Sequence, residues 1–144
     1  MTARRVLAYA WASPTTLLGL FAGAACGARW QRREGVLEGA GPGVARGFDL
    51  MAPGRGIVAM TLGHVVLGRD AAALDETRAH ERVHVTQCER WGAAFVPAYL
   101  AASAIAWARG GDAYRDNPFE RAAWTEAPLP RCRAASRTPL DDPA

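Results

Sequence analysis

Hydrophobic residues gather in two long uncharged runs, and the first lies at the N-terminus. Residues 6–28 carry no charged side chain and are followed by Arg29, Arg32 and Arg33. A helix needs about 20 apolar residues to cross a bilayer, so this run predicts a single membrane-spanning helix. A cleaved signal peptide and a helix packed within the fold are the alternatives. Arginines at both ends leave the orientation in the membrane open.

The chain between the two runs holds glycine-rich turns and short apolar segments. Glycines recur over residues 35–56, which predicts turns around one short extended piece at 44–51. β-Branched and apolar residues fill 57–68 on both sides of Leu62 and Gly63, which predicts two strands joined by a tight turn. We therefore expect a small antiparallel sheet.

Signals for a helix follow the two strands. Asp70 or Asp75 is suited to be an N-cap, and Gly92 stands where a helix usually ends, so we predict a helix over residues 74–91.

The second uncharged run covers residues 91–108 and is divided by Pro97. About 12 helical residues remain after the proline, or ~18 Å, which is too short to span a bilayer. We expect a helix that packs on the core or dips into one leaflet. A third helix is predicted to begin with Asn117 as N-cap, Pro118 in the first position and Glu120 in the third.

Together these elements predict an α+β fold. A chain of 144 residues accommodates one domain, which we place at 35–126, after an N-terminal hydrophobic segment at 1–34 and before a loose C-terminal tail at 127–144.

Charge and cysteine content exclude two classes of protein. The 17 basic residues are all arginines, scattered among 14 acidic residues, and the net charge of +3 forms no clustered stripe for nucleic acid. Cys26, Cys88 and Cys132 are too few and too far apart for a disulfide framework.

The segment HERVH at residues 80–84 carries the candidate chemistry. His80 and His84 lie one helical turn apart on the same face, so their imidazoles can converge on one metal ion. Glu81 projects beside them, as a general base acting on zinc-bound water does. The alternative is an ordinary polar helix surface, with Glu81 paired to an arginine.

Catalytic zinc needs a third protein ligand, and Glu120 on the next predicted polar helix is our candidate. A glutamate three residues after an asparagine N-cap also fits a capping box, so both roles stay open. Cys88 is about 12 Å along the helix from His80, too far to share the ion. His64 is a ligand, a substrate contact or a structural residue.

Two tyrosines are candidates for stabilising the oxyanion of a tetrahedral intermediate. We favour Tyr114 over Tyr99, because Tyr114 is nearer to Glu120 in the sequence. Glu81 and His84 also spell the ExxH half of a di-iron motif, but no second ExxH occurs, so a di-iron centre is rejected.

Three segments, TLGHVVLGRD, HERVHVTQCERWG and YRDNPFERAAW, resemble small bacterial proteins of the HExxH gluzincin type, some of them membrane-associated. The resemblance covers residues 57–124 and includes Gln87 and Gly92 after the second histidine. It implies a minimal zincin-like fold, with His80, His84 and Glu120 as zinc ligands and Glu81 as general base.

The sequence thus predicts a zinc-dependent metallopeptidase that hydrolyses peptide or protein substrates, with Glu81 and Tyr114 as catalytic residues. One strand of 57–68 would receive an extended peptide by β-pairing. We expect the enzyme at the inner membrane through its N-terminal helix, with the side open. The alternatives are a non-enzymatic zinc-binding scaffold and a metal-free helical membrane protein. Another divalent metal also suits two histidines and one carboxylate.

Overall fold

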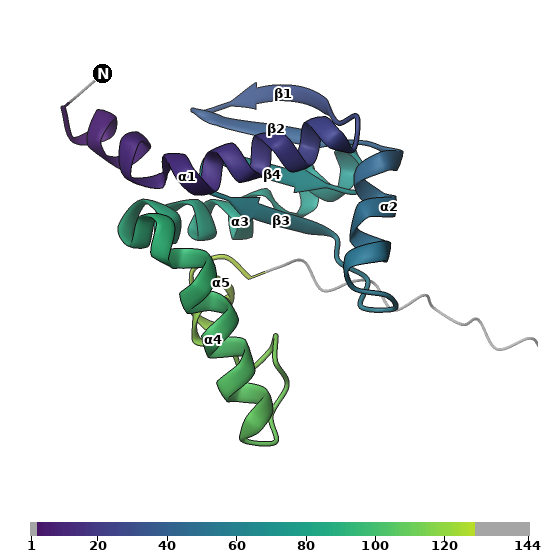
Figure 1. Cartoon of the computed structure of the whole chain (residues 1–144), viewed down its shortest axis with the longest axis vertical. Coiled ribbons are helices and arrows are strands. Elements are labelled where there is room, and N and C mark those ends of the chain that lie inside the picture. Colours follow the sequence, from purple (N-terminus) through teal and green to yellow (C-terminus); the bar gives the residue numbers. More distant parts are fainter. Residues whose placement is uncertain (1–2, 129–144) are drawn as a thin grey trace, which may run out of the picture.

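A four-stranded sheet lies between helix α1 (Ala3–Ala25) and helix α3 (Ala71–Trp91) in the computed structural model, which describes residues 3–128 (Figure 1). The predicted α+β class is confirmed. The predicted tail, 127–144, lies outside the described residues except for its first two. The other elements are β1 (Arg29–Arg33), β2 (Val36–Ala40), α2 (Pro42–Met51), β3 (Ala59–Leu62), β4 (Val65–Gly68), the 3-10 helix η1 (Gly92–Ala94), α4 (Phe95–Ala108) and α5 (Pro118–Glu126).

The sheet is mixed, with the strand order β1-β2-β4-β3. β1 pairs antiparallel with β2, and β3 pairs antiparallel with β4, but β2 and β4 run parallel. The prediction of an antiparallel sheet is therefore wrong at its centre. A parallel pair needs a crossover connection, which α2 and β3 provide between β2 and β4. As a result β3 forms one edge of the sheet.

The first hairpin was not predicted. β1 consists of RWQRR, whose residues are half-buried or exposed, so no apolar alternation marks it as a strand. Glu34 and Gly35 join it to β2 with successive φ values of 50° and 85°. Two positive φ values are what a two-residue hairpin loop of type I′ requires, and they bring β1 back along β2.

The extended piece predicted at residues 44–51 is also wrong, although turns flank it as expected. Helix α2 occupies them, with Pro42 in its first turn and with Val44 and Phe48 buried. Val44 and Phe48 are spaced by one helical turn, so both face the sheet. Gly43 permits this packing, because a Cβ there would stand 1.9 Å from the carbonyl oxygen of Cys26.

The predicted hairpin and two of the predicted helices are confirmed, although α3 begins at Ala71 and not at residue 74. β3 and β4 form the predicted hairpin, with its turn after Leu62. The Asp70 carboxylate accepts from the backbone N–H of Ala73 at 2.8 Å and caps α3, which Gly92 ends with φ 58°. The Asn117 side chain accepts from Phe119 N–H at 2.9 Å and caps α5.

Two apolar clusters fill the layers on either side of β4. Val66 packs with Val36 and with Leu74 and Val85 of α3. Val65 and Leu67 point to the opposite face, because side chains alternate along a strand. There they join Val44 and Phe48 of α2 and, among others, Leu20 and Ala22 of α1.

Small residues bring α1 close to the sheet. A Cβ at Gly19 would lie 2.8 Å from Val65, and a Cβ at Gly23 would lie 2.4 Å from the ring of Trp30. The opposite side of α1 is exposed. Within residues 3–128, α1 over Val6–Ala25 and the α3–α4 segment over Ala71–Ala108 are long and apolar enough to cross a membrane, by length and composition alone.

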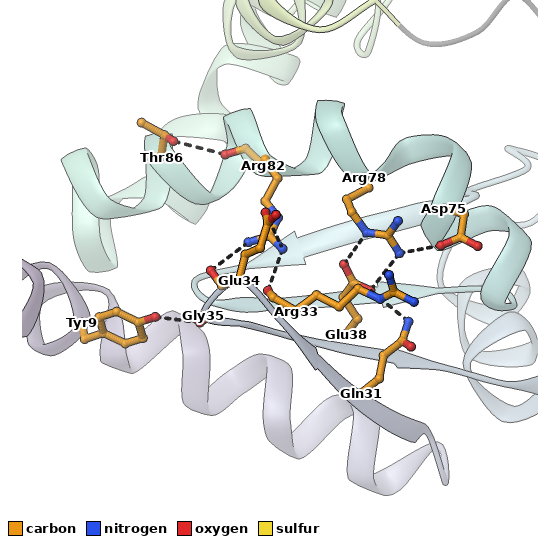
Figure 2. A network of polar contacts seen from close by, with 10 residues as sticks. All are labelled: Tyr9, Gln31, Arg33, Glu34, Gly35, Glu38, Asp75, Arg78, Arg82 and Thr86. Carbon is orange, nitrogen blue, oxygen red and sulfur yellow. Dashed lines mark hydrogen bonds and ion pairs between the residues drawn. The ribbon is translucent and has the colours of Figure 1, made fainter. Parts of the chain in front are cut away.

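A polar network fixes α3 over the first hairpin (Figure 2). The buried Glu38 of β2 accepts from Arg78 Nε at 3.0 Å and Arg78 Nη2 at 3.2 Å, and from Gln31 Nε2 at 2.9 Å. Arg82 Nη2 donates to the carbonyl of Arg33 at 2.6 Å. A bidentate arginine–carboxylate pair fixes orientation as well as distance, so this network sets the rotation of α3 about its own axis.

Candidate metal centre

Helix α3 presents the two histidines of HERVH to one point. The rings of His80 and His84 lie edge to face with centroids 4.9 Å apart, and their Nε2 atoms are separated by 3.2 Å. Arg78 and Arg82 point to the first hairpin on the sheet side, where they hold the helix.

Helix α5 brings Glu120 to the same point. Its Oε2 lies 3.1 Å from His80 Nε2, and its Oε1 lies 3.3 Å from His84 Nε2. The capping-box role is not observed, because the backbone N–H of Asn117 donates to the carbonyl of Tyr114 at 3.1 Å. The structure therefore brings together the three side chains selected from the sequence as metal ligands, and all three are buried.

The spacing of these atoms fits a tetrahedral metal ion. Ligand atoms at 2.0–2.1 Å from zinc, separated by tetrahedral angles, are roughly 3.3 Å from one another. The separations of 3.1, 3.2 and 3.3 Å between the Nε2 atoms and the carboxylate match that value. Two imidazoles and one carboxylate are also a donor set that zinc accepts.

Gln87 decides which nitrogen of His84 carries the proton. Gln87 Nε2 donates to the carbonyl of Phe119 at 3.0 Å, so its Oε1 must be the atom 2.8 Å from His84 Nδ1. His84 Nδ1 is then a donor, and Nε2 of the neutral ring offers a lone pair. That lone pair faces His80 Nε2 and a carboxylate oxygen of Glu120, an arrangement that a cation would stabilise.

The charges of the cluster shift two pKa values in opposite directions. Burial opposes ionisation of Glu120, but its contacts with His80 and His84 outweigh burial and hold its pKa at about 2. Burial alone would lower the pKa of His84, and the adjacent Glu120 raises it above its usual value instead. Glu120 is therefore ionised at neutral pH, as a metal ligand must be.

Glu81 lies within reach of the same charges. Its Oε2 accepts from the Thr61 hydroxyl of β3 at 2.6 Å. Burial raises the pKa of Glu81, although Thr61, His84 and His80 each act to lower it. A carboxyl whose pKa is moved upward is better matched to taking and returning a proton near neutral pH.

Tyr99 and Tyr114 occupy different positions around Glu120. The Tyr99 hydroxyl donates to Glu120 Oε1 at 2.7 Å, and burial and that carboxylate raise the pKa of the phenol. Tyr114 is partly exposed with its ring against Trp124, and burial followed by the charge of Glu120 raises its pKa. Tyr99 thus orients the Glu120 carboxylate, whereas the oxyanion role of Tyr114 stays a prediction.

His64 is not part of the cluster. It lies buried in the β3–β4 turn, where its ring stacks on Tyr9 with centroids 3.9 Å apart. Its Nε2 lies 3.0 Å from Glu89 Oε1. Of the roles considered for His64, these contacts favour the structural one.

Sequence reasoning missed how three residues support the cluster, although Tyr99 was considered as an oxyanion candidate and Asn117 as an N-cap. Thr61, Tyr99 and Asn117 come from three different elements, and nothing in their spacing ties them to HERVH. Asn117 Nδ2 donates to the Tyr99 carbonyl at 3.1 Å and to Ser103 Oγ at 2.8 Å, and so holds α5 against α4. Gln87 carried the one available signal, because it follows His84 by three residues on the same helix.

The fold and this cluster define an α+β protein with a buried two-histidine, one-carboxylate site. Comparison with protein-family models, with curated proteins and with solved structures finds no match.

Proposed function

We propose that the protein is a zinc-dependent metallopeptidase. The observation that carries this proposal is the convergence of His80, His84 and Glu120 beside the carboxyl of Glu81. Zinc held by these three side chains would lower the pKa of a coordinated water toward ~7 and polarise the substrate carbonyl.

The chain's own residues then supply the proton transfers and the orientation. Glu81 takes a proton from the attacking water and returns it to the amine as the C–N bond breaks, so that water adds across the peptide bond. Thr61 holds the Glu81 carboxyl by its hydrogen bond. Gln87 and Tyr99 fix His84 and Glu120, so the ligands need little reorganisation on metal binding.

The position of β3 supports a peptide as the substrate. β3 is an edge strand that pairs on one side with β4 and carries Thr61, which contacts Glu81. An extended peptide can add to such an edge through main-chain hydrogen bonds, which place a scissile bond without requiring a particular side chain. We propose that peptide or protein substrates bind there, at the inner membrane.

Metal content and turnover test the proposal together. We expect one zinc per chain in the purified wild type, and its loss in His80→Ala and Glu120→Ala. Glu81→Gln is close in shape, keeps an oxygen for Thr61, and should retain zinc while losing peptide hydrolysis. Turnover by a zinc-loaded Glu81→Gln variant would remove Glu81 from the role of base, and a wild type that takes up no zinc would refute the metal site.

Burial of the site favours a second candidate, the non-enzymatic zinc scaffold. The exposed fractions of His80, His84 and Glu120 are 2%, 6% and 3%. A hollow of about 390 Å³ lies instead beside β1 and the first turn of α3, lined by Arg29, Trp30, Leu74 and neighbouring residues. A closed site of this kind would hold α3 and α5 together.

Cobalt substitution separates the two candidates. A peptidase site keeps an open coordination position, so a small hydroxamate should change the visible spectrum of the cobalt-loaded protein. In a closed structural site the spectrum would stay unchanged as hydroxamate is added, and no peptide hydrolysis would be measured.

A further inference from the structure

Helix α1 has two apolar faces, and the sheet covers only one. The covered face includes Ala12, Gly19 and Gly23, which approach η1 and the strands closely. The outer face is exposed and carries no charged side chain from residue 6 onward. Its members are Val6, Leu7, Ala10, Trp11, Pro14, Leu17, Leu18, Phe21, Ala24 and Ala25.

Helix α4 carries a second surface of the same kind. Leu100, Ile105 and Trp107 are 60%, 50% and 73% exposed, and residues 91–108 contain no charged side chain. The two helices meet through η1, where a Cβ on Gly92 would stand 2.4 Å from Trp11. In Figure 1, α1 lies in front of the sheet and α4 in front of α5, so both helices lie on the same side of the molecule.

The residues at the ends of these helices indicate which partner covers the surface. Arg29 lies four residues after the end of α1 and Arg109 directly after α4, while Trp91 and Trp107 are exposed near the two ends of α4. Protein–protein interfaces carry a polar rim around an apolar core. Tryptophans and arginines that border an apolar surface are typical of the interface between lipid and water.

The packing of α1 is incompatible with a crossing. β1, with Arg29, Arg32 and Arg33, lies beside α1, since Trp30 fills the space at Gly23. A spanning α1 would carry that strand and its arginines into hydrocarbon, at a high cost in free energy. α4 has 14 residues, or about 21 Å, and is too short to cross.

We infer that α1 and α4 lie in the plane of the membrane interface, with their outer faces in the lipid, and that neither crosses the bilayer. We propose this arrangement in place of the single crossing predicted from the sequence. The arginines beside both helices favour anionic lipid headgroups over zwitterionic ones. The inference does not depend on the metal site, so an experiment can refute the membrane surface without refuting the metal site, and the reverse.

Vesicle flotation tests the surface. We expect the purified full chain to float with vesicles of phosphatidylethanolamine and phosphatidylglycerol, and less with phosphatidylcholine alone. The double variant Leu18→Glu, Phe21→Glu should lower the bound fraction more than about tenfold, because both side chains are exposed and leave lipid rather than the core. Thr125→Glu, an exposed residue of α5, is the matched control and should bind as the wild type does.

Protease access distinguishes lying on the membrane from crossing it. The protein carries an epitope at each end and is reconstituted in both orientations into sealed vesicles, and protease is added outside. A protein that lies in the plane of the membrane then loses both epitopes or neither. Molecules that lose only one epitope would overturn the inference in favour of a crossing. A wild type that does not float with any of the vesicles would overturn the inference. A wild type that forms a dimer, which the double variant dissociates, would show that a second copy of the chain covers the surface.

Discussion

Replacing Gln87 by methionine removes the side chain that links His84 to α5. Gln87 accepts from His84 Nδ1 at 2.8 Å and donates to the carbonyl of Phe119 at 3.0 Å. Methionine is similar in length and volume but makes neither hydrogen bond. His80 Nδ1 is buried without a partner among the described residues, so Gln87 is the outer contact that fixes a ring of the cluster.

The expected effect on metal binding follows from this geometry. Without Gln87 Oε1, the proton of His84 can move to Nε2, where it must be displaced before a metal binds. Loss of such an outer partner costs about 10–100-fold in metal affinity, or roughly 1.4–2.7 kcal/mol. Loss of the hydrogen bond from Gln87 to the Phe119 carbonyl adds a separate loss of about 0.5–1.5 kcal/mol in the stability of the metal-free protein.

Competition with a chromophoric chelator measures the zinc Kd, and urea unfolding measures stability. Gln87→Glu separates the two effects, because a carboxylate still accepts from His84 Nδ1 but no longer donates to Phe119. We expect Gln87→Glu to lose stability while keeping more of its zinc affinity than Gln87→Met. A Gln87→Met variant whose zinc Kd stays within about twofold of the wild type would refute the tautomer argument.

Three further substitutions test the fold and the cluster. Glu38→Ala leaves Arg78 without its buried partner, so we expect a loss of about 3 kcal/mol in urea unfolding, whereas Asp75→Ala, on the exposed side of the same arginine, should cost under about 1 kcal/mol. Equal losses would contradict the assignment of Glu38 as the centre of the network. The pKa of Glu120 is about 2, below its ordinary 4.5, so in the metal-free protein its stabilising effect is present above about pH 4.5 and is lost as the pH falls toward 2. The free energy of unfolding of Glu120→Gln should therefore fall less than that of the wild type between about pH 4.5 and pH 2, by about 3 kcal/mol in all. An equal fall in both proteins would refute the lowered pKa of Glu120. Gly43→Ala should destabilise the protein by about 1–3 kcal/mol, because its Cβ meets the Cys26 backbone; stability within about 0.5 kcal/mol of the wild type would contradict that contact.

The elements that local signals define were predicted well. HERVH, the cap at Asp70 or Asp75, the end at Gly92 and the start at Asn117 each depend on residues a few positions apart. The structure selects Asp70, which places the start of α3 at Ala71, and it confirms the other two boundaries. The convergence of Glu120 on the two histidines was also predicted, because a catalytic zinc site needs a third ligand.

The parts that depend on distant segments were not predicted. β1 is stabilised by pairing with β2 and by the hydrogen bond from Arg82 to the Arg33 carbonyl, so its own sequence of polar residues gives no strand signal. The parallel pairing of β2 with β4 depends on where α2 crosses, and glycines concealed that helix. Thr61 contacts Glu81, and Tyr99 contacts Glu120, only because β3 packs against α3 and α4 packs beside α5 in the folded chain.

The hydrogen bonds of Asn117 have a consequence for how fast metal leaves. They join α4 and α5 into one arm, which connects to α3 through η1 and through the cluster itself. Since His80 and His84 are buried and the arm itself carries Glu120, a chelator in solution can reach the ion only after the arm swings away from α3. We therefore expect the rate of zinc removal to level off as chelator concentration rises, at the rate at which the arm opens, and to increase in Asn117→Ala without a matching change in the chemistry of the ligands.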